Sequence, residues 1–134
     1  MVGVLIVTHG KLSVELLKSA ELIVGKQEYV NTLTLNYGDN VEDLKKEINK
    51  NIKELDDGDG VLVLTDVFGG SPTNATIINM KDLNFRAITG VNLPMLLELF
   101  CMRDELDLND LAEKAFKAGK EGIKDLNEIL ANAN

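Results

Sequence analysis

Two residues far apart in the sequence have side chains suited to chemistry: His9, the only histidine of the chain, and Asp66. An imidazole that attacks as a nucleophile offers the lone pair of one nitrogen, so the other nitrogen carries the proton and donates it to an acceptor such as a carboxylate. When a phosphoryl group is attacked, the ring becomes cationic and the same carboxylate stabilises that charge. His9 and Asp66 are therefore interpreted as a phosphoryl-accepting histidine and its orienting aspartate.

A glycine-rich turn follows Asp66 and contains Gly69, Gly70 and Ser71, with Pro72 directly after them. Glycines allow the backbone to approach an anion, and the free N–H groups at a helix N-terminus attract one. Serine followed by proline is typical of a helix N-cap and the first helical position. We therefore expect Ser71 to cap a helix, and Gly69, Gly70 and Ser71 to bind a phosphate next to His9.

Two other functions would use the same residues. A Ser71–His9–Asp66 triad would make a small hydrolase, although the chain has no Gly-x-Ser-x-Gly to hold the serine on a strained turn. A non-catalytic, anion-sensing regulatory module of flavodoxin-like fold would bind phosphate without accepting it. Esterase turnover distinguishes the hydrolase, and phosphorylation of His9 distinguishes the carrier from the module.

No metal or nucleotide cofactor is expected. A single imidazole excludes the two-histidine arrangements of many zinc sites. Gly10-Lys11 is followed by leucine where a nucleotide-binding loop needs serine or threonine.

The elements that must bring His9 and Asp66 together are indicated by hydropathy. Residues 2–7 and 61–64 are continuous or nearly continuous apolar segments, typical of strands covered on both faces. Residues 29–35 and 85–89 are expected to form shorter or more polar strands. Helical spacing predicts helices that follow His9 and end near Gly25, begin after Asn40, run from Pro94 to Met102, and run from a cap at Asn109 through Leu126.

Strands that alternate with helices predict an α/β fold with a doubly wound, mostly parallel sheet and helices on both faces. If the two apolar strands are central, the strand order is 2-1-3-4 and the connections reverse direction between strands 1 and 3. Ligands of open α/β sheets bind at the carboxyl ends of the strands beside that point, where His9 and Asp66 are expected. The length of 134 residues predicts a single domain, residues 1–134.

The composition excludes some classes of partner. Lys and Arg number 14 against 22 Asp and Glu, a formal charge of −8 that argues against nucleic acid or an anionic membrane surface. The single cysteine, Cys101, excludes an intramolecular disulfide and is interpreted as a packing residue. With no membrane-length apolar run and no recognisable signal peptide, a cytoplasmic location is expected.

Three segments carry a resemblance to a known family: residues 4–10 (VLIVTHG), residues 65–75 (TDVFGGSPTNA) and residues 90–95 (GVNLPM). In order and separation they resemble the enzyme IIA component of the mannose family of the bacterial phosphoenolpyruvate-dependent sugar phosphotransferase system. The resemblance implies a cytoplasmic phosphocarrier whose His9 takes a phosphoryl group from phospho-HPr on Nε2. It passes this group to the IIB component, which phosphorylates sugar entering through the membrane IIC and IID components. Asp66 would hydrogen-bond Nδ1, and Ser71 with its neighbouring amides would lie against the phosphate.

The resemblance also implies a homodimer formed by an exchanged C-terminal strand, whereas residues 123–134 have the pattern of a helix. Val67 stands where some relatives have a hydroxyl residue, so any phosphate contact there would use the backbone. We expect the rim of the pocket around His9 to be open and partly apolar, so that HPr can bring its phosphohistidine within reach. Phe68, Tyr37 and Met95 are the candidate residues of this rim. The chain ends before any fused IIB domain, so a stand-alone IIA protein is expected. The sugar is not determined, because the family's IIA proteins do not contact it.

Overall fold

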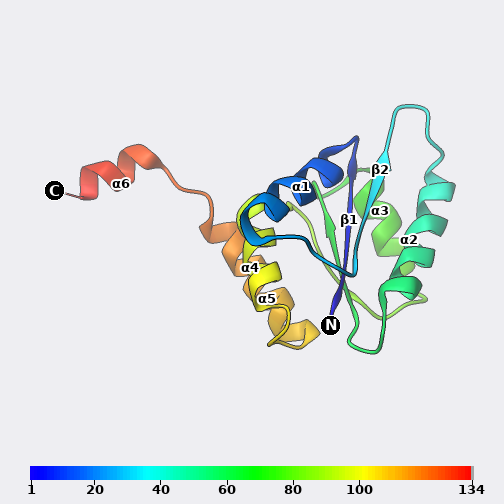
Figure 1. Ribbon diagram of the computed structural model, residues 1–134. Helices are drawn as coiled ribbons and strands as arrows, with labels where there is room; N and C mark the ends of the chain where they lie inside the picture. Colours follow the sequence, from blue (N-terminus) through cyan, green and yellow to red (C-terminus); the bar gives the residue numbers. More distant parts are fainter. Residues whose placement is uncertain (134) are drawn as a thin grey trace.

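The computed structural model describes residues 1–133, and within them four parallel strands form one sheet flanked by helices (Figure 1). The strand order is β2-β1-β3-β4, which confirms the predicted topology and class. In chain order the elements are β1 (Gly3–His9), α1 (Leu12–Val24), β2 (Val30–Leu35), α2 (Val41–Leu55), β3 (Val61–Thr65), α3 (Gly70–Asn79), β4 (Arg86–Ile88), α4 (Leu93–Met102), α5 (Leu108–Glu121) and α6 (Leu126–Asn132).

The two apolar strands are central because both of their faces are covered. Val4 and Ile6 of β1 pack in a core with α1, α4 and α5, while Leu5 and Val7 pack in a second core with α2 and α3. All four side chains are fully buried. Figure 1 shows the same two layers of helices on opposite sides of the sheet. The alternation of side chains along a strand thus produces two cores from one continuous apolar sequence.

One of the predicted helix caps is confirmed and another is wrong. Asn40 caps α2 as expected, with its side chain accepting from the N–H of Glu42. The predicted cap at Asn109 is wrong: Asp107 caps α5 and accepts from the N–H of Asp110. The side chain of Asn109 instead accepts from Arg86 of β4 at 2.9 Å.

The C-terminal segment is not one helix. It was expected to continue through Leu126, but α5 ends at Glu121, where a Cβ on the following Gly122 would lie 2.4 Å from Cβ of Pro94. Asp125 then caps the separate helix α6 by accepting from two backbone N–H groups. In Figure 1, α6 extends away from the sheet and its covering helices, and none of its residues is buried. The remaining residue of the predicted helix, Asn134, lies outside the described residues.

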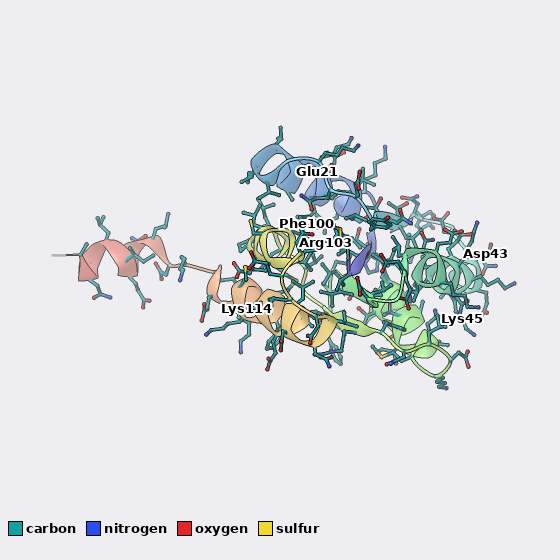
Figure 2. All side chains as sticks on the ribbon, turned by 60° about the horizontal axis from the view of Figure 1, so that its bottom comes forward. Glu21, Asp43, Lys45, Phe100, Arg103 and Lys114 are labelled. Carbon is teal, nitrogen blue, oxygen red and sulfur yellow. The ribbon has the colours of Figure 1, made fainter. Side chains whose placement is uncertain are left out.

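A buried arginine ties together the amino ends of β1 and β2. Arg103 is 3% exposed and donates to the carbonyls of Val2 (3.0 and 2.8 Å) and Tyr29 (2.8 Å). It lies beside Phe100, 5.8 Å from the ring centre (Figure 2). Cys101, two residues earlier, is exposed, so its interpretation as a packing residue is wrong.

No helix among residues 1–133 is long and apolar enough to cross a bilayer.

Candidate active site at the carboxyl ends of β1 and β3

The ends of the two central strands bring His9 and Asp66 together. Val7 of β1 is paired in register with Thr65 of β3, so the residues that follow on each strand leave the sheet side by side. The backbone N–H of His9 donates to Oδ2 of Asp66 at 2.8 Å, and this hydrogen bond joins the carboxyl end of β1 to that of β3. Two residues separated by 57 positions are therefore neighbours because of the parallel register.

The same carboxylate oxygen is 2.8 Å from Nδ1 of the His9 ring. A carboxylate can only accept, so Nδ1 carries the proton and Nε2 retains its lone pair. The His9 side chain is 50% exposed and that of Asp66 only 10%. The imidazole is thus held by a nearly buried partner while its reactive side remains open to solvent.

The pKa of Asp66 is set by opposing effects. Burial raises it, but the hydrogen bonds from the backbone and ring of His9 and from the N–H of Val67 lower it by more, so the pKa lies below its ordinary value. Oδ1 accepts the Val67 N–H at 3.0 Å. Asp66 is therefore ionised at neutral pH and able to stabilise a positive charge on His9.

The glycine turn lies against the other nitrogen of the ring. A Cβ on Gly70 would be 3.0 Å from Cε1 and 3.4 Å from Nε2 of His9. Gly69 and Gly70 both have positive φ angles, 86° and 77°, which only glycine adopts readily. The first turn of α3, which begins at Gly70, is thus placed beside Nε2, where its N–H groups favour an anion.

The predicted role of Ser71 as the helix cap is wrong. Gly69 occupies the N-cap position and α3 begins at Gly70, because the two positive-φ glycines turn the chain into the helix two residues earlier than a cap at Ser71 would. The hydrogen bond of the His9 ring goes to Asp66, and among residues 1–133 no hydrogen bond joins that ring to Ser71. A serine–histidine–aspartate triad is not assembled.

The surroundings of His9 are open and partly apolar. Of the three predicted rim residues, Phe68 is 87% exposed and Tyr37 is fully exposed, whereas Met95 is buried on the inward face of α4 and does not belong to a rim. Val67, beside Phe68, is also exposed. A cavity of about 710 Å³ lies elsewhere, next to Met1, and does not involve the site.

Thr65 and Thr73 were not predicted to have a role at the site, yet their buried hydroxyl groups lie 2.8 Å apart beneath the turn. The signal available was a threonine at the end of an otherwise apolar strand and another on the inward face of α3. No group of three or more His, Cys, Asp and Glu side chains within residues 1–133 is placed to hold a metal ion.

A family model described as the PTS system fructose IIA component matches residues 3–116. The chain belongs to this family. This result confirms the resemblance to IIA components of the sugar phosphotransferase system. The IIA chain is 39% identical over 128 residues to the mannose-specific EIIAB component of Escherichia coli (strain K12), covering 93% of this chain and 39% of that protein. It is 32% identical over 112 residues to the fructose-specific EIIA component of Bacillus subtilis (strain 168), covering 83% of this chain and 77% of that one.

Solved structures agree with this assignment. The phosphotransferase system component EIIA from Streptococcus agalactiae superposes with a TM-score of 0.86 at 32% identity, covering 96% of the IIA chain and 99% of that structure. The PTS IIA protein associated with the fucose utilization operon of Streptococcus pneumoniae gives 0.83 at 30% identity, with coverage of 96% and 95%. The IIA chain spans about 39% of the length of the E. coli relative, which is named for both an A and a B component.

Proposed function

We propose that this IIA chain is a cytoplasmic phosphocarrier in which His9 accepts a phosphoryl group from phospho-HPr and passes it to a IIB component. The observation that supports this most strongly is the hydrogen bond of 2.8 Å between Nδ1 of His9 and the Asp66 carboxylate. It leaves the lone pair on Nε2, the nitrogen that faces the turn at Gly70.

In the proposed step, Nε2 attacks the phosphorus and the bond from phosphorus to the donor's histidine nitrogen breaks. The electron pair of that bond returns to the donor, which leaves as a neutral imidazole. His9 becomes cationic and keeps its Nδ1 proton, which it donates to Asp66. The backbone N–H groups of Gly69, Gly70 and Ser71 are proposed to neutralise the phosphoryl oxygens. In transfer to the IIB component, a nucleophile of that protein attacks the phosphorus, the Nε2–P bond breaks, and its electron pair returns to Nε2, so that His9 is neutral again.

A protein donor fits the shape of the surface. His9 is half exposed and is not at the bottom of a cavity, so a second histidine carried by another protein can reach it. Exposed Phe68 and Val67 next to the site supply apolar contact area for HPr and for the IIB component. The membrane IIC and IID components are reached only indirectly, through IIB, and no nucleic acid or cofactor takes part.

We also propose a homodimer, because α6 has no covering within one copy. Leu126 and Leu130 are 73% and 71% exposed, and Phe116 of α5, which lines a groove beside β4, is 51% exposed. A second copy would cover these side chains. Sedimentation equilibrium should give a dimer for the wild-type chain and a monomer for the Leu126→Glu, Leu130→Glu double variant. A wild-type monomer at micromolar concentration would contradict the dimer without affecting the carrier proposal.

The carrier is tested by intact-protein mass spectrometry after incubation with phosphoenolpyruvate, enzyme I and HPr. Wild type should gain one phosphoryl group that is labile in acid and stable in base, and His9→Ala should gain none. Ser71→Ala should still be phosphorylated, because it retains the nucleophile, and no variant should hydrolyse esters. A folded wild-type chain that stays unmodified beside a competent HPr control would refute the carrier and favour the anion-sensing module.

A further inference from the structure

Two buried threonines from different elements meet beneath the turn at the site. Thr65, the last residue of β3, is 1% exposed, and Thr73 of α3 is 3% exposed. Their Oγ1 atoms are 2.8 Å apart, and Oγ1 of Thr73 is also 2.5 Å from the carbonyl oxygen of Val67. The two hydroxyl groups therefore connect the end of β3, the first half of α3 and the loop that joins them.

The direction of these hydrogen bonds follows from the proton count. The Val67 carbonyl can only accept, so the single hydroxyl proton of Thr73 is donated to it. Thr73 must then accept from Thr65. The hydrogen bonds therefore run in one direction: the Thr65 hydroxyl donates to Thr73, and the Thr73 hydroxyl donates to the Val67 carbonyl.

The carbonyl that receives this bond belongs to the residue next to Asp66. The N–H of Val67 donates to Oδ1 of Asp66 at 3.0 Å, while Oδ2 of Asp66 receives the backbone N–H and the ring of His9. The Val67 side chain is 52% exposed, so packing of that side chain does not hold the loop in place. Two side chains hold the Val67 backbone instead: the Asp66 carboxylate accepts its N–H, and the Thr73 hydroxyl donates to its carbonyl.

Burial of hydroxyl groups needs a reason. A hydroxyl without a partner is costly in an apolar interior, and valine would fill nearly the same volume at no such cost. Thr76, on the same helix and 2% exposed, uses its hydroxyl within α3 by donating to Pro72 at 2.8 Å. The bond from Thr73 leaves the helix and ends on the loop of the site.

We propose that Thr73, supported by Thr65, is a positioning residue for His9. It fixes the Val67 carbonyl, and through the adjoining peptide it sets the direction of the Asp66 carboxylate, which keeps the proton on Nδ1 of His9. The part that concerns phosphoryl transfer rests on the proposed function, whereas the part that concerns the His9 proton does not.

Because the chain has one histidine, long-range ¹H–¹⁵N NMR of the unphosphorylated protein, with the ring neutral, reports its proton position directly. Wild type should show mainly the Nδ1–H form. Thr73→Val removes the bond to Val67 and should increase the ratio of the Nε2–H to the Nδ1–H form about fivefold, the effect of one ordinary hydrogen bond. The rate at saturating phospho-HPr follows the fraction of the reactive Nδ1–H form, so it should fall by less than threefold, with KM unchanged. Thr73→Ser retains the hydroxyl and should restore both.

Thr76→Val is the matched control, since it removes a buried hydroxyl of the same helix that does not reach the loop. It should leave the His9 proton and the rate unchanged. A Thr73→Val variant with the wild-type tautomer ratio would overturn the proposal, as would an equal loss in Thr76→Val. If Thr73→Val does not fold, Thr65→Val serves instead; it should shift the ratio in the same direction by a smaller factor, and an unchanged ratio would overturn the proposal.

The two proposals fail separately. A wild-type chain that takes no phosphoryl group refutes the phosphocarrier, and the tautomer comparison between Thr73→Val and Thr73→Ser still tests the positioning role. Normal phosphorylation of Thr73→Val with an unchanged ratio refutes the positioning role alone.

Discussion

Replacement of Asp66 by asparagine preserves the size of the side chain and removes its charge, so it isolates what the carboxylate does for His9. Three N–H groups converge on the wild-type carboxylate: the backbone and ring of His9 on Oδ2, each at 2.8 Å, and the N–H of Val67 on Oδ1 at 3.0 Å. An asparagine has one accepting oxygen, and its NH₂ group can only donate. Every orientation of Asp66→Asn therefore loses at least one of these bonds.

The two orientations have different consequences for the ring. With its oxygen toward His9, asparagine keeps the Nδ1 proton in place but leaves the cation formed during transfer without a countercharge. With its NH₂ group toward His9, it forces Nδ1 to accept, which moves the proton to Nε2 and removes the nucleophilic lone pair. A hydrogen bond to a charged group contributes about 1.5–3 kcal/mol, so the rate of phosphorylation should fall about 10- to 100-fold.

The assay is the initial rate of phosphorylation by phospho-HPr, followed by intact mass at short times. Asp39→Asn is the matched control, because Asp39 also accepts a backbone N–H (from Asn36, at 2.7 Å) in a loop without contacting His9. It should transfer at the wild-type rate. Asp66→Asn with a wild-type rate, or with a loss equal to that of Asp39→Asn, would refute the role of the carboxylate.

Three further outcomes concern stability. Arg103→Met should lower the free energy of unfolding by about 2–4 kcal/mol in urea titrations, because it removes two hydrogen bonds to the buried carbonyl of Val2 and one to the carbonyl of Tyr29, which keeps its bond from the N–H of Val4. Gly3→Ala should lower it by about 1–3 kcal/mol, since the new Cβ would lie 2.7 Å from the carbonyl oxygen of Leu55; an unchanged midpoint would contradict the close approach of α2. The pKa of Asp66 is lowered by folding, so its ionisation stabilises the protein above the ordinary value of 3.8, and this contribution is lost as the pH falls through the lower folded value. Acid titrations should therefore show a smaller loss of stability below about pH 4 for Asp66→Asn than for wild type.

The strand order and the approach of His9 to Asp66 could be predicted because they depend on coarse hydropathy. Residues 2–7 and 61–64 have too few polar positions to expose either face, so they had to be the central strands. Once their directions are parallel, the residues that follow them meet at one edge of the sheet. The glycine turn next to Nε2 followed from the same placement.

Helix ends were less predictable because neighbouring residues compete for the same cap. Asp107 and Asn109 both suit an N-cap, and the partner that Asn109 finds on β4, Arg86, is 23 residues away. Ser71 loses the cap position because the positive φ angles of Gly69 and Gly70 start the helix earlier. Backbone angles of this kind are decided by contacts, not by residue type alone.

The sequence by itself determined the class of fold, the two residues of the candidate site and the family, since all three are carried by residue types at fixed separations. Only the tertiary structure decided which hydroxyl groups would meet beneath the turn and which side chains around His9 would stay exposed. Thr65 and Thr73 are paired by the packing of α3 against β3, and Met95 is removed from the rim because it is buried on the inward face of α4. Burial and long-range hydrogen bonds depend on which surfaces face each other, and that is set when the elements pack together.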